Sequence, residues 1–249
     1  MVRSVFGLLG RLLFNFWRLL TAPLWWLARY ATKPRARWVH VRLRSRIAEI
    51  EKPPPFFMRW VPGFDEARPT SLTTLRELAG MVVEDPRIEG VVFDVPLLAA
   101  GWATCQSLRQ VLVGLRERGR KVAVYLPQGA SNREIYVASA ADRILAGPHT
   151  QIAPLGLAAS FTYVKGLLGH AGVSVEVHRR AEYKTAAELA TNDAMSEPQR
   201  EQTQALLDTL DGALREALGA RMGLGAEGVD ALFSAALLDA DEAREKGLV

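Results

Sequence analysis

The chain has 249 residues, 49% of them hydrophobic, which is enough for one substantial core and an appendage but not for two full domains. Its single cysteine, Cys105, excludes an intrachain disulfide and any cysteine-rich metal site. The formal net charge is +4, and the positive excess precedes the first acidic residue, Glu49.

Residues 1–30 predict an amphipathic helix that lies in the plane of a membrane. Leu, Phe and Trp dominate this stretch, but Arg11 and Arg18 leave only Leu19–Ala28 free of charge, and a spanning helix needs about 20 apolar residues. The four arginines of the stretch fall within about one quadrant of a helix, on a face that suits anionic lipid. The tryptophans suit the headgroup level. The alternative is a soluble helix whose apolar face packs on the domain.

Residues 31–68 are expected to form a basic and proline-rich linker. Six basic residues lie between Lys33 and Arg46, and a run of three prolines and a Pro-Gly pair follow. The basic residues can reinforce contact with lipid. No fold-level motif for nucleic acid accompanies them, so lipid and not nucleic acid is the predicted partner. One domain, 69–249, follows the linker.

Strand and helix patterns alternate from residue 69 onward. Helical spacing of apolar residues predicts helices over 71–84, 104–118, 132–141 and 163–171, and short apolar runs predict strands over 90–95, 121–126, 143–146 and 174–179. A capping box at Ser196–Gln199 opens a helix that runs to 222, and a short helix spans 239–247. This order implies an α/β domain with a largely parallel sheet covered by helices.

Five segments of this domain occur in an informative order. They are Asp85–Pro96, Gly101–Ala103, Tyr136–Ile144, Tyr183–Ala186 and Met195–Pro198. In that order they resemble the bacterial signal peptide peptidase A family of serine/lysine peptidases. The resemblance runs from about 69 to 249 and implies a fold similar to ClpP and crotonase. It is closest to the N-terminal half of the long form, in which the first half supplies the catalytic lysine and the second half the serine.

Lys184 takes, by this resemblance, the position of the general base that accepts the proton of the attacking serine hydroxyl. A lysine can do so only in its neutral form, which loss of water or nearby positive charge favours. Arg179 and Arg180 would favour that form, and Glu182 and Glu188 would oppose it if they pointed at Lys184. Without the resemblance, Lys184 is an exposed lysine at the start of a helix.

The expected nucleophile is missing from this chain. The family's serine precedes a segment like the one that begins at Tyr136, and Asn132 stands at its position. Asparagine has no nucleophilic chemistry for acyl transfer. Arg133 and Glu134 replace two glycines, which removes the close backbone approach that an oxyanion hole uses. Ser131 is expected to be a helix N-cap rather than a nucleophile.

No metal or cofactor is expected. Cys105 lies among apolar helix positions and is predicted to be a packed thiol. The four histidines show no metal-ligand spacing, and no glycine-rich loop that would hold a phosphate is present.

The predicted function is that of a membrane-associated signal peptide peptidase, a serine endopeptidase that degrades cleaved signal peptides or other apolar peptides. This chain would supply Lys184, require a serine-bearing second domain or subunit, be inactive alone, and act as an oligomer. Its apolar ending, Leu248–Val249, suggests a truncated product. The expected location is the bacterial cytoplasmic membrane; the family favours the periplasmic face, and the basic flank favours the cytoplasmic one. The alternatives are a non-catalytic membrane scaffold of the same fold and a basic membrane-surface adaptor.

Overall fold

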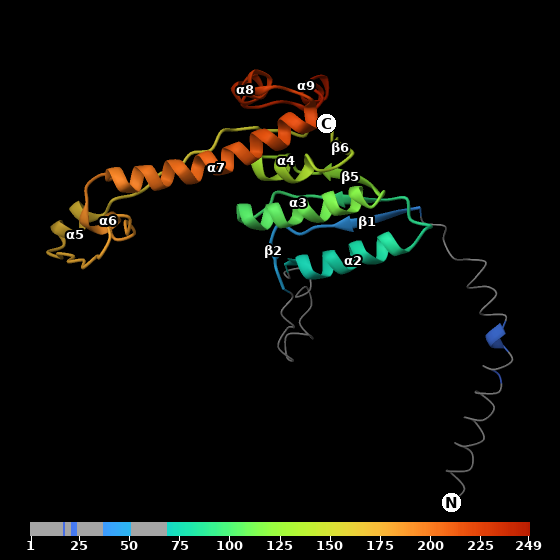
Figure 1. The fold of residues 1–249 in the computed structure, drawn as a ribbon, viewed down its shortest axis with the longest axis horizontal. Helices are drawn as coiled ribbons and strands as arrows, with labels where there is room; N and C mark the ends of the chain where they lie inside the picture. The colour runs from blue at the N-terminus through green and yellow to red at the C-terminus, as the bar shows by residue number, and fades with distance from the viewer. Residues whose placement is uncertain (1–16, 18–20, 24–36, 51–68) are drawn as a thin grey trace, which may run out of the picture. The chain divides into compact units, whose positions relative to one another are not determined.

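The computed structural model describes residues 17, 21–23, 37–50 and 69–249 (Figure 1). The chain divides into two compact units, Met1–Arg37 and Trp38–Val249. The predicted in-plane helix at 1–30 falls almost entirely outside the described residues. Among the residues that are described, no helix is long and apolar enough to cross a membrane.

A four-stranded parallel sheet lies at the centre of the Trp38–Val249 unit. Its order is β1-β4-β5-β6, and all neighbours are parallel. These strands are β1 (Trp38–Arg42), β4 (Gly90–Asp94), β5 (Lys121–Leu126) and β6 (Arg143–Ala146). A second parallel pair consists of β2 (Ile47–Ala48) and β3 (Thr70–Ser71). Strands β4, β5 and β6 confirm the strands predicted at 90–95, 121–126 and 143–146.

Strand β1 lies inside the range 31–68 that the sequence assigned to a linker. It alternates in period two and pairs residue by residue with β4, but its basic residues hid the strand pattern. The neighbours of β4 approach closely at Gly90, where a Cβ atom would lie 2.5 Å from the Lys121 carbonyl oxygen and 2.6 Å from the Trp38 ring. The sheet therefore begins upstream of residue 69, where the domain was expected to start.

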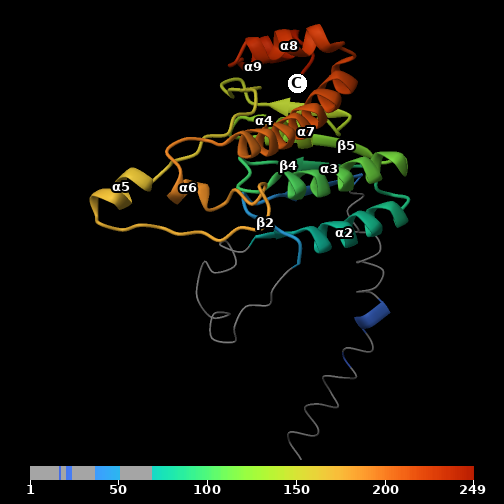
Figure 2. The same cartoon turned by 60° about the vertical axis from the view of Figure 1, so that its left-hand side comes forward.

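Four helices follow one another across the unit (Figures 1 and 2). Helix α2 packs on α3, α3 on α4 and on β5, and α4 on α7. They are α2 (Leu72–Glu84), α3 (Trp102–Glu117), α4 (Asn132–Ala138) and α7 (Glu197–Met222). Their apolar faces and the sheet bury one core, whose largest fully buried side chains include Phe93, Leu112, Leu126 and Leu218. Two short helices, α8 (Ala226–Ser234) and α9 (Ala240–Glu245), follow α7.

Helix α7 begins and ends where its sequence predicts, but only the N-cap half of the predicted capping box is formed, because the Gln199 side chain accepts the Tyr163 hydroxyl at 2.8 Å. The Ser196 hydroxyl accepts a hydrogen bond from the Gln199 N–H at 3.3 Å as the N-cap. Gly223 stops the helix in the left-handed conformation with φ 65°. The middle of α7 is exposed, and its C-terminal half buries Leu214 and Leu218 in the core.

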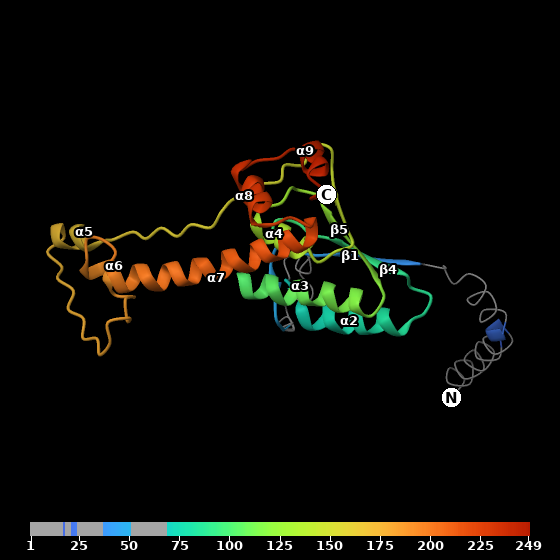
Figure 3. The same ribbon diagram turned by 45° about the horizontal axis from the view of Figure 1, so that its top comes forward.

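Residues 156–196 form an arm that extends from the sheet and lies beside the N-terminal part of α7 (Figures 1 and 3). The arm contains α5 (Lys165–His170) and α6 (Glu188–Thr191). The helix predicted at 163–171 is present as α5. The strand predicted at 174–179 is wrong as an assignment in this structure, because the residues find no neighbouring strand to pair with in the part of the chain that is described.

Candidate active site

Lys184 lies in the arm, in a turn that hydrogen bonds fasten to α7. The Gln202 side-chain amide donates to the Tyr183 carbonyl oxygen at 2.7 Å, and the buried Thr185 hydroxyl donates to Gln202 Oε1 at 3.1 Å. The Tyr183 hydroxyl donates to the Glu201 carboxylate at 2.8 Å. Both neighbours of Lys184 are therefore held in place by the first turns of α7.

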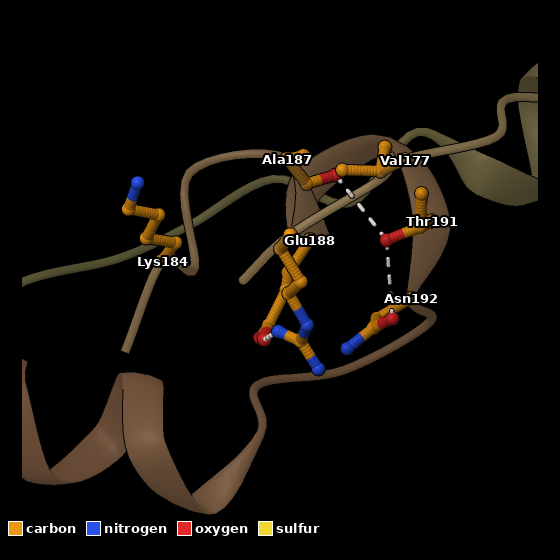
Figure 4. Close-up of a pocket in the computed structure, with 7 residues that line it drawn as sticks. Val177, Lys184, Ala187, Glu188, Thr191 and Asn192 are labelled. Atoms are coloured by element: carbon orange, nitrogen blue, oxygen red, sulfur yellow. Dashed lines mark hydrogen bonds and ion pairs between the residues drawn. The ribbon is translucent and has the colours of Figure 1, made fainter. Parts of the chain in front are cut away.

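The Lys184 side chain is exposed and makes no hydrogen bond or ion pair with any described residue. It lines a shallow pocket of about 140 Å³ together with Val177, Ala187 and Asn192. Figure 4 shows its ammonium group pointing away from α6. The amine is therefore available to an incoming group, but this chain alone does not remove it from water.

The buried carboxylate of the same pocket, Glu188, pairs with Arg179 and not with Lys184. Glu188 has a side chain only 3% exposed, and Arg179 Nη1 lies 2.6 Å from its Oε1 atom. The proximity of Ser196 lowers the pKa of Glu188 most; burial opposes this, and Arg179 lowers the pKa further. Sequence reasoning left open whether Glu188 opposes a neutral Lys184, and the structure shows Glu188 engaged elsewhere.

Glu134 closes the start of α4, the place where the family's serine is expected. Its carboxylate is 1% exposed and accepts the Leu98 N–H at 2.6 Å and the Ser131 N–H at 2.8 Å. The Ser131 hydroxyl donates to it as well, at 2.6 Å, in a capping box. Ser131 is thus the predicted N-cap, and the Leu98 and Ser131 backbone amides are both bonded to the Glu134 carboxylate.

Asn132 is held beside this closed site. Its side-chain amide donates to the Gly156 carbonyl oxygen at 3.4 Å, and its Oδ1 atom is buried without a hydrogen-bond partner among the described residues. Arg133 Nη1 donates to the Leu98 carbonyl oxygen at 3.3 Å, so both groups of the Leu98 backbone are bonded to α4. Asn132 and Lys184 are not brought together: Asn132 begins α4, and the turn that holds Lys184 is bonded to Glu201 and Gln202 in the first turns of α7. Figures 1 and 3 show α4 beside the C-terminal half of α7, away from its N-terminal end.

The remaining residues considered in the sequence analysis are the cysteine and the histidines. Cys105 is fully buried on α3, and burial raises the pKa of its thiol to about 11. His40 Nε2 lies 2.8 Å from Asp94 Oδ1 at the surface. The described residues contain no group of three or more His, Cys, Asp or Glu that could hold a metal ion.

Sequence reasoning missed the bond between Glu134 and Leu98. The Ser131-x-x-Glu134 spacing signals the capping box, but 36 residues separate Glu134 from Leu98 and only the fold joins them.

Comparison with known proteins identifies the class of protein to which this parallel α/β unit belongs. Residues 114–249, more than half of the chain, match the model of Peptidase family S49, so this chain belongs to that family. The predicted membership in the signal peptide peptidase A group is confirmed, and so is the predicted α/β fold class with a parallel sheet. The N-terminal membrane helix that belonged to the same prediction stays a prediction.

Two curated relatives support this assignment. The chain is 24% identical over 179 residues to the chloroplastic serine protease SPPA of Arabidopsis thaliana, covering 72% of this chain and 26% of that protein. It is 29% identical over 138 residues to Protease 4 of Salmonella typhi, covering 55% of this chain and 22% of that protein. The chain therefore spans about a quarter of the length of either relative.

Solved structures match more weakly. A peptidase from Plasmodium falciparum aligns with a TM-score of 0.47 and 8% identity, covering 86% of this chain and 93% of that one. A second structure, described only as an enzyme, aligns with a TM-score of 0.46 and 7% identity, covering 86% and 92%.

Proposed function

We propose that this chain is the lysine-bearing part of a serine/lysine peptidase that cuts cleaved signal peptides or other apolar peptides at the bacterial cytoplasmic membrane. Lys184 acts as the general base, and the serine comes from a second domain or subunit. Membership of Peptidase family S49 supports the class of reaction, and the name of the Arabidopsis relative records a serine protease.

The observation that carries this proposal is the unpaired Lys184 amine. Glu188, the buried carboxylate of its pocket, is bonded to Arg179, and Glu201 accepts the Tyr183 hydroxyl. A carboxylate bonded to Lys184 would stabilise the ammonium form and oppose its use as a base. The neighbouring turn therefore holds Lys184 in place without bonding a carboxylate to its amine.

The need for a partner follows from the closed start of α4. Asn132 cannot attack a carbonyl carbon, and Glu134 already occupies the Leu98 amide. A serine-bearing domain that docked over the arm would supply the hydroxyl and exclude water from the exposed amine. Loss of water disfavours the charged form of lysine, so docking itself would activate Lys184.

Residues 1–30 are proposed to attach the peptidase to lipid as an in-plane amphipathic helix. Salt or carbonate washing should then release the protein from membranes, and replacing Arg11 and Arg18 by Glu should weaken its binding to anionic vesicles. Protein that stays in the membrane after carbonate treatment would contradict the in-plane arrangement.

Co-expression with a serine-bearing domain of the same family tests the dyad. Lys184→Ala should lower hydrolysis of an apolar reporter peptide by at least about 100-fold, because general bases contribute roughly that much or more. Lys165→Ala is the matched control: this arm lysine pairs with Asp193 at 2.7 Å and should retain full turnover. Turnover that survives in Lys184→Ala, with assembly intact, refutes the assignment.

A non-catalytic scaffold of the same fold is the second candidate. The exposure of Lys184 together with the occupied Leu98 amide favours it, because neither feature belongs to a finished active site. A complex that assembles with the serine-bearing domain but gives equal turnover with wild-type and Lys184→Ala chains would select this role.

A further inference from the structure

The four-stranded sheet has one face that lies outside the hydrophobic core. Side chains alternate between the two faces of a sheet, and the strand register puts paired residues on the same face. On one face, Val91, Val122 and Ile144 form one core with the buried side chains of α2 and α3. Val92 and Ala123, on the other, belong neither to this core nor to the apolar residues packed against it. This second face carries alternate residues counted from Trp38, Gly90, Lys121 and Arg143, and we call it the open face.

The open face carries an excess of positive charge. Its cations are Arg42, Lys121 and Arg143, and Asp94 is the one carboxylate that the four strands place on it. His40 Nε2 lies 2.8 Å from Asp94 Oδ1, and Arg42 Nε lies 3.6 Å from Asp94 Oδ2, so this carboxylate is already engaged. The Arg42 side chain is still 82% exposed. Lys121 and Arg143 are exposed and make no hydrogen bond or ion pair with any described residue.

Two large apolar side chains are exposed on the same face. Trp38 is 44% and Leu145 47% exposed, and the Trp38 ring lies over Gly90, in the same cross-strand row as Lys121. A tryptophan beside lysine and arginine suits the headgroup level of a bilayer, because its ring is apolar and its N–H group is polar. The core of a stable protein interface is depleted in charged residues, whereas cations are spread across this face. The composition of the open face therefore favours lipid over a protein partner.

We propose that the open face lies against the surface of a bilayer that contains anionic lipid. Residues 1–30 are proposed to lie in the same surface, and the seven residues 31–37 span at most about 25 Å before the chain enters β1 at Trp38. Both attachments therefore fit on one membrane. In this respect alone the inference rests on the proposed function, and it does not depend on Lys184 or on a serine-bearing domain. Helices α2 and α3, on the core face of the sheet, then face away from the lipid.

Sedimentation of the full chain with vesicles tests the charge requirement. The probe is a vesicle of equal parts phosphatidylglycerol and phosphatidylcholine, compared with one of phosphatidylcholine alone. Each Lys or Arg at an anionic surface contributes about fivefold to the partition constant, so Lys121→Gln with Arg143→Gln should lower that constant roughly 20-fold.

The matched control is Arg200→Gln with Lys246→Gln, which removes the same charge from exposed helical positions. It should lower the partition constant by less than about threefold, because salt screens charges that do not touch the surface. Equal losses in the two double variants, or no loss in the first, overturn the proposal.

A fluorescent label shows which face meets the lipid. Leu145→Cys places a thiol on the open face and Met81→Cys places one on the exposed side of α2, while Cys105 stays unlabelled because it is buried. With an environment-sensitive dye, anionic vesicles should shift the emission of the Leu145→Cys label to the blue and leave that of the Met81→Cys label unchanged.

The label separates failure of this proposal from failure of the proposed in-plane helix. Membrane-bound protein whose Leu145→Cys label stays in water overturns the open-face proposal and leaves attachment through residues 1–30 standing. A shifted label in a chain whose binding ignores reversal of Arg11 and Arg18 supports the open face and refutes the helix. A shift that needs no lipid and grows with protein concentration assigns the face to a second copy, and one produced by duplex DNA but not by vesicles assigns it to nucleic acid. Either result overturns the proposal, as does a chain that binds neither vesicle.

Discussion

Replacing Glu134 by alanine should destabilise the Trp38–Val249 unit more than any exposed substitution. The carboxylate accepts the Leu98 N–H, the Ser131 N–H and the Ser131 hydroxyl, at 2.6, 2.8 and 2.6 Å. Its removal leaves the Leu98 N–H buried and unbonded, since Leu98 is only 5% exposed and no other described acceptor bonds it.

The expected loss in the free energy of unfolding follows from these three hydrogen bonds. A buried donor left without an acceptor costs about 1–3 kcal/mol, and loss of a capping interaction about 1 kcal/mol. Ser131 is only half-buried, so water can replace part of its loss. Glu134→Ala should therefore lower the free energy of unfolding by about 3 kcal/mol, or the Tm by roughly 6 to 12 °C for a unit of this size. Glu134→Gln keeps one acceptor oxygen and should lose about half as much.

Urea unfolding followed by tryptophan fluorescence measures the free energy of unfolding. Trp102 reports on α4, because its ring packs edge-on against Tyr136 with ring centroids 5.7 Å apart. The denaturant dependence of the free energy should be unchanged, since the surface exposed on unfolding is the same. Glu77→Ala, an exposed change on α2, is the control and should stay within about 0.5 kcal/mol. A loss below about 1 kcal/mol for Glu134→Ala refutes the view that Glu134 anchors Leu98.

Two further predictions concern buried groups. Cys105 should resist alkylation by iodoacetamide at pH 8 in the native protein and react fully in denaturant. Its thiol is buried, and burial raises its pKa to about 11. Rapid labelling of the native protein would contradict this and show that α3 opens. The lowered pKa of Glu188 stabilises the folded state above its unfolded pKa of about 4.3 and loses that effect as pH falls through the folded value. Glu188→Gln should therefore be less stable than wild type at pH 7, and the gap should narrow toward pH 3; a gap that does not change with pH contradicts this.

Periodicity predicted the parts of the fold whose apolar faces are buried within this chain. Strands β4 and β5 are short apolar runs with a neighbour on either side, and α7 carries both of its end signals, Ser196 and Gly223. Strand β1 was missed because it lies at the edge of the sheet, where Trp38, His40 and Arg42 remain exposed and the apolar pattern is weak. The segment 174–179 was predicted as a strand on equally good β-propensity, yet pairing depends on a neighbour and not on propensity alone.

The candidate site was predictable only where its chemistry is local in sequence. The N-cap role of Ser131 was predicted from adjacent residues, but two glutamates bond to groups that only the tertiary fold brings near them. Glu188 belongs to Arg179 rather than Lys184, and Glu134 reaches Leu98 across the unit. The first pairing leaves the Lys184 amine without a carboxylate partner among the described residues, and the second occupies the Leu98 amide at the start of α4. Both pairings agree with the proposal that Lys184 acts on a hydroxyl supplied by another domain. Under that proposal, the Lys184→Ala measurement has meaning only in the assembled complex.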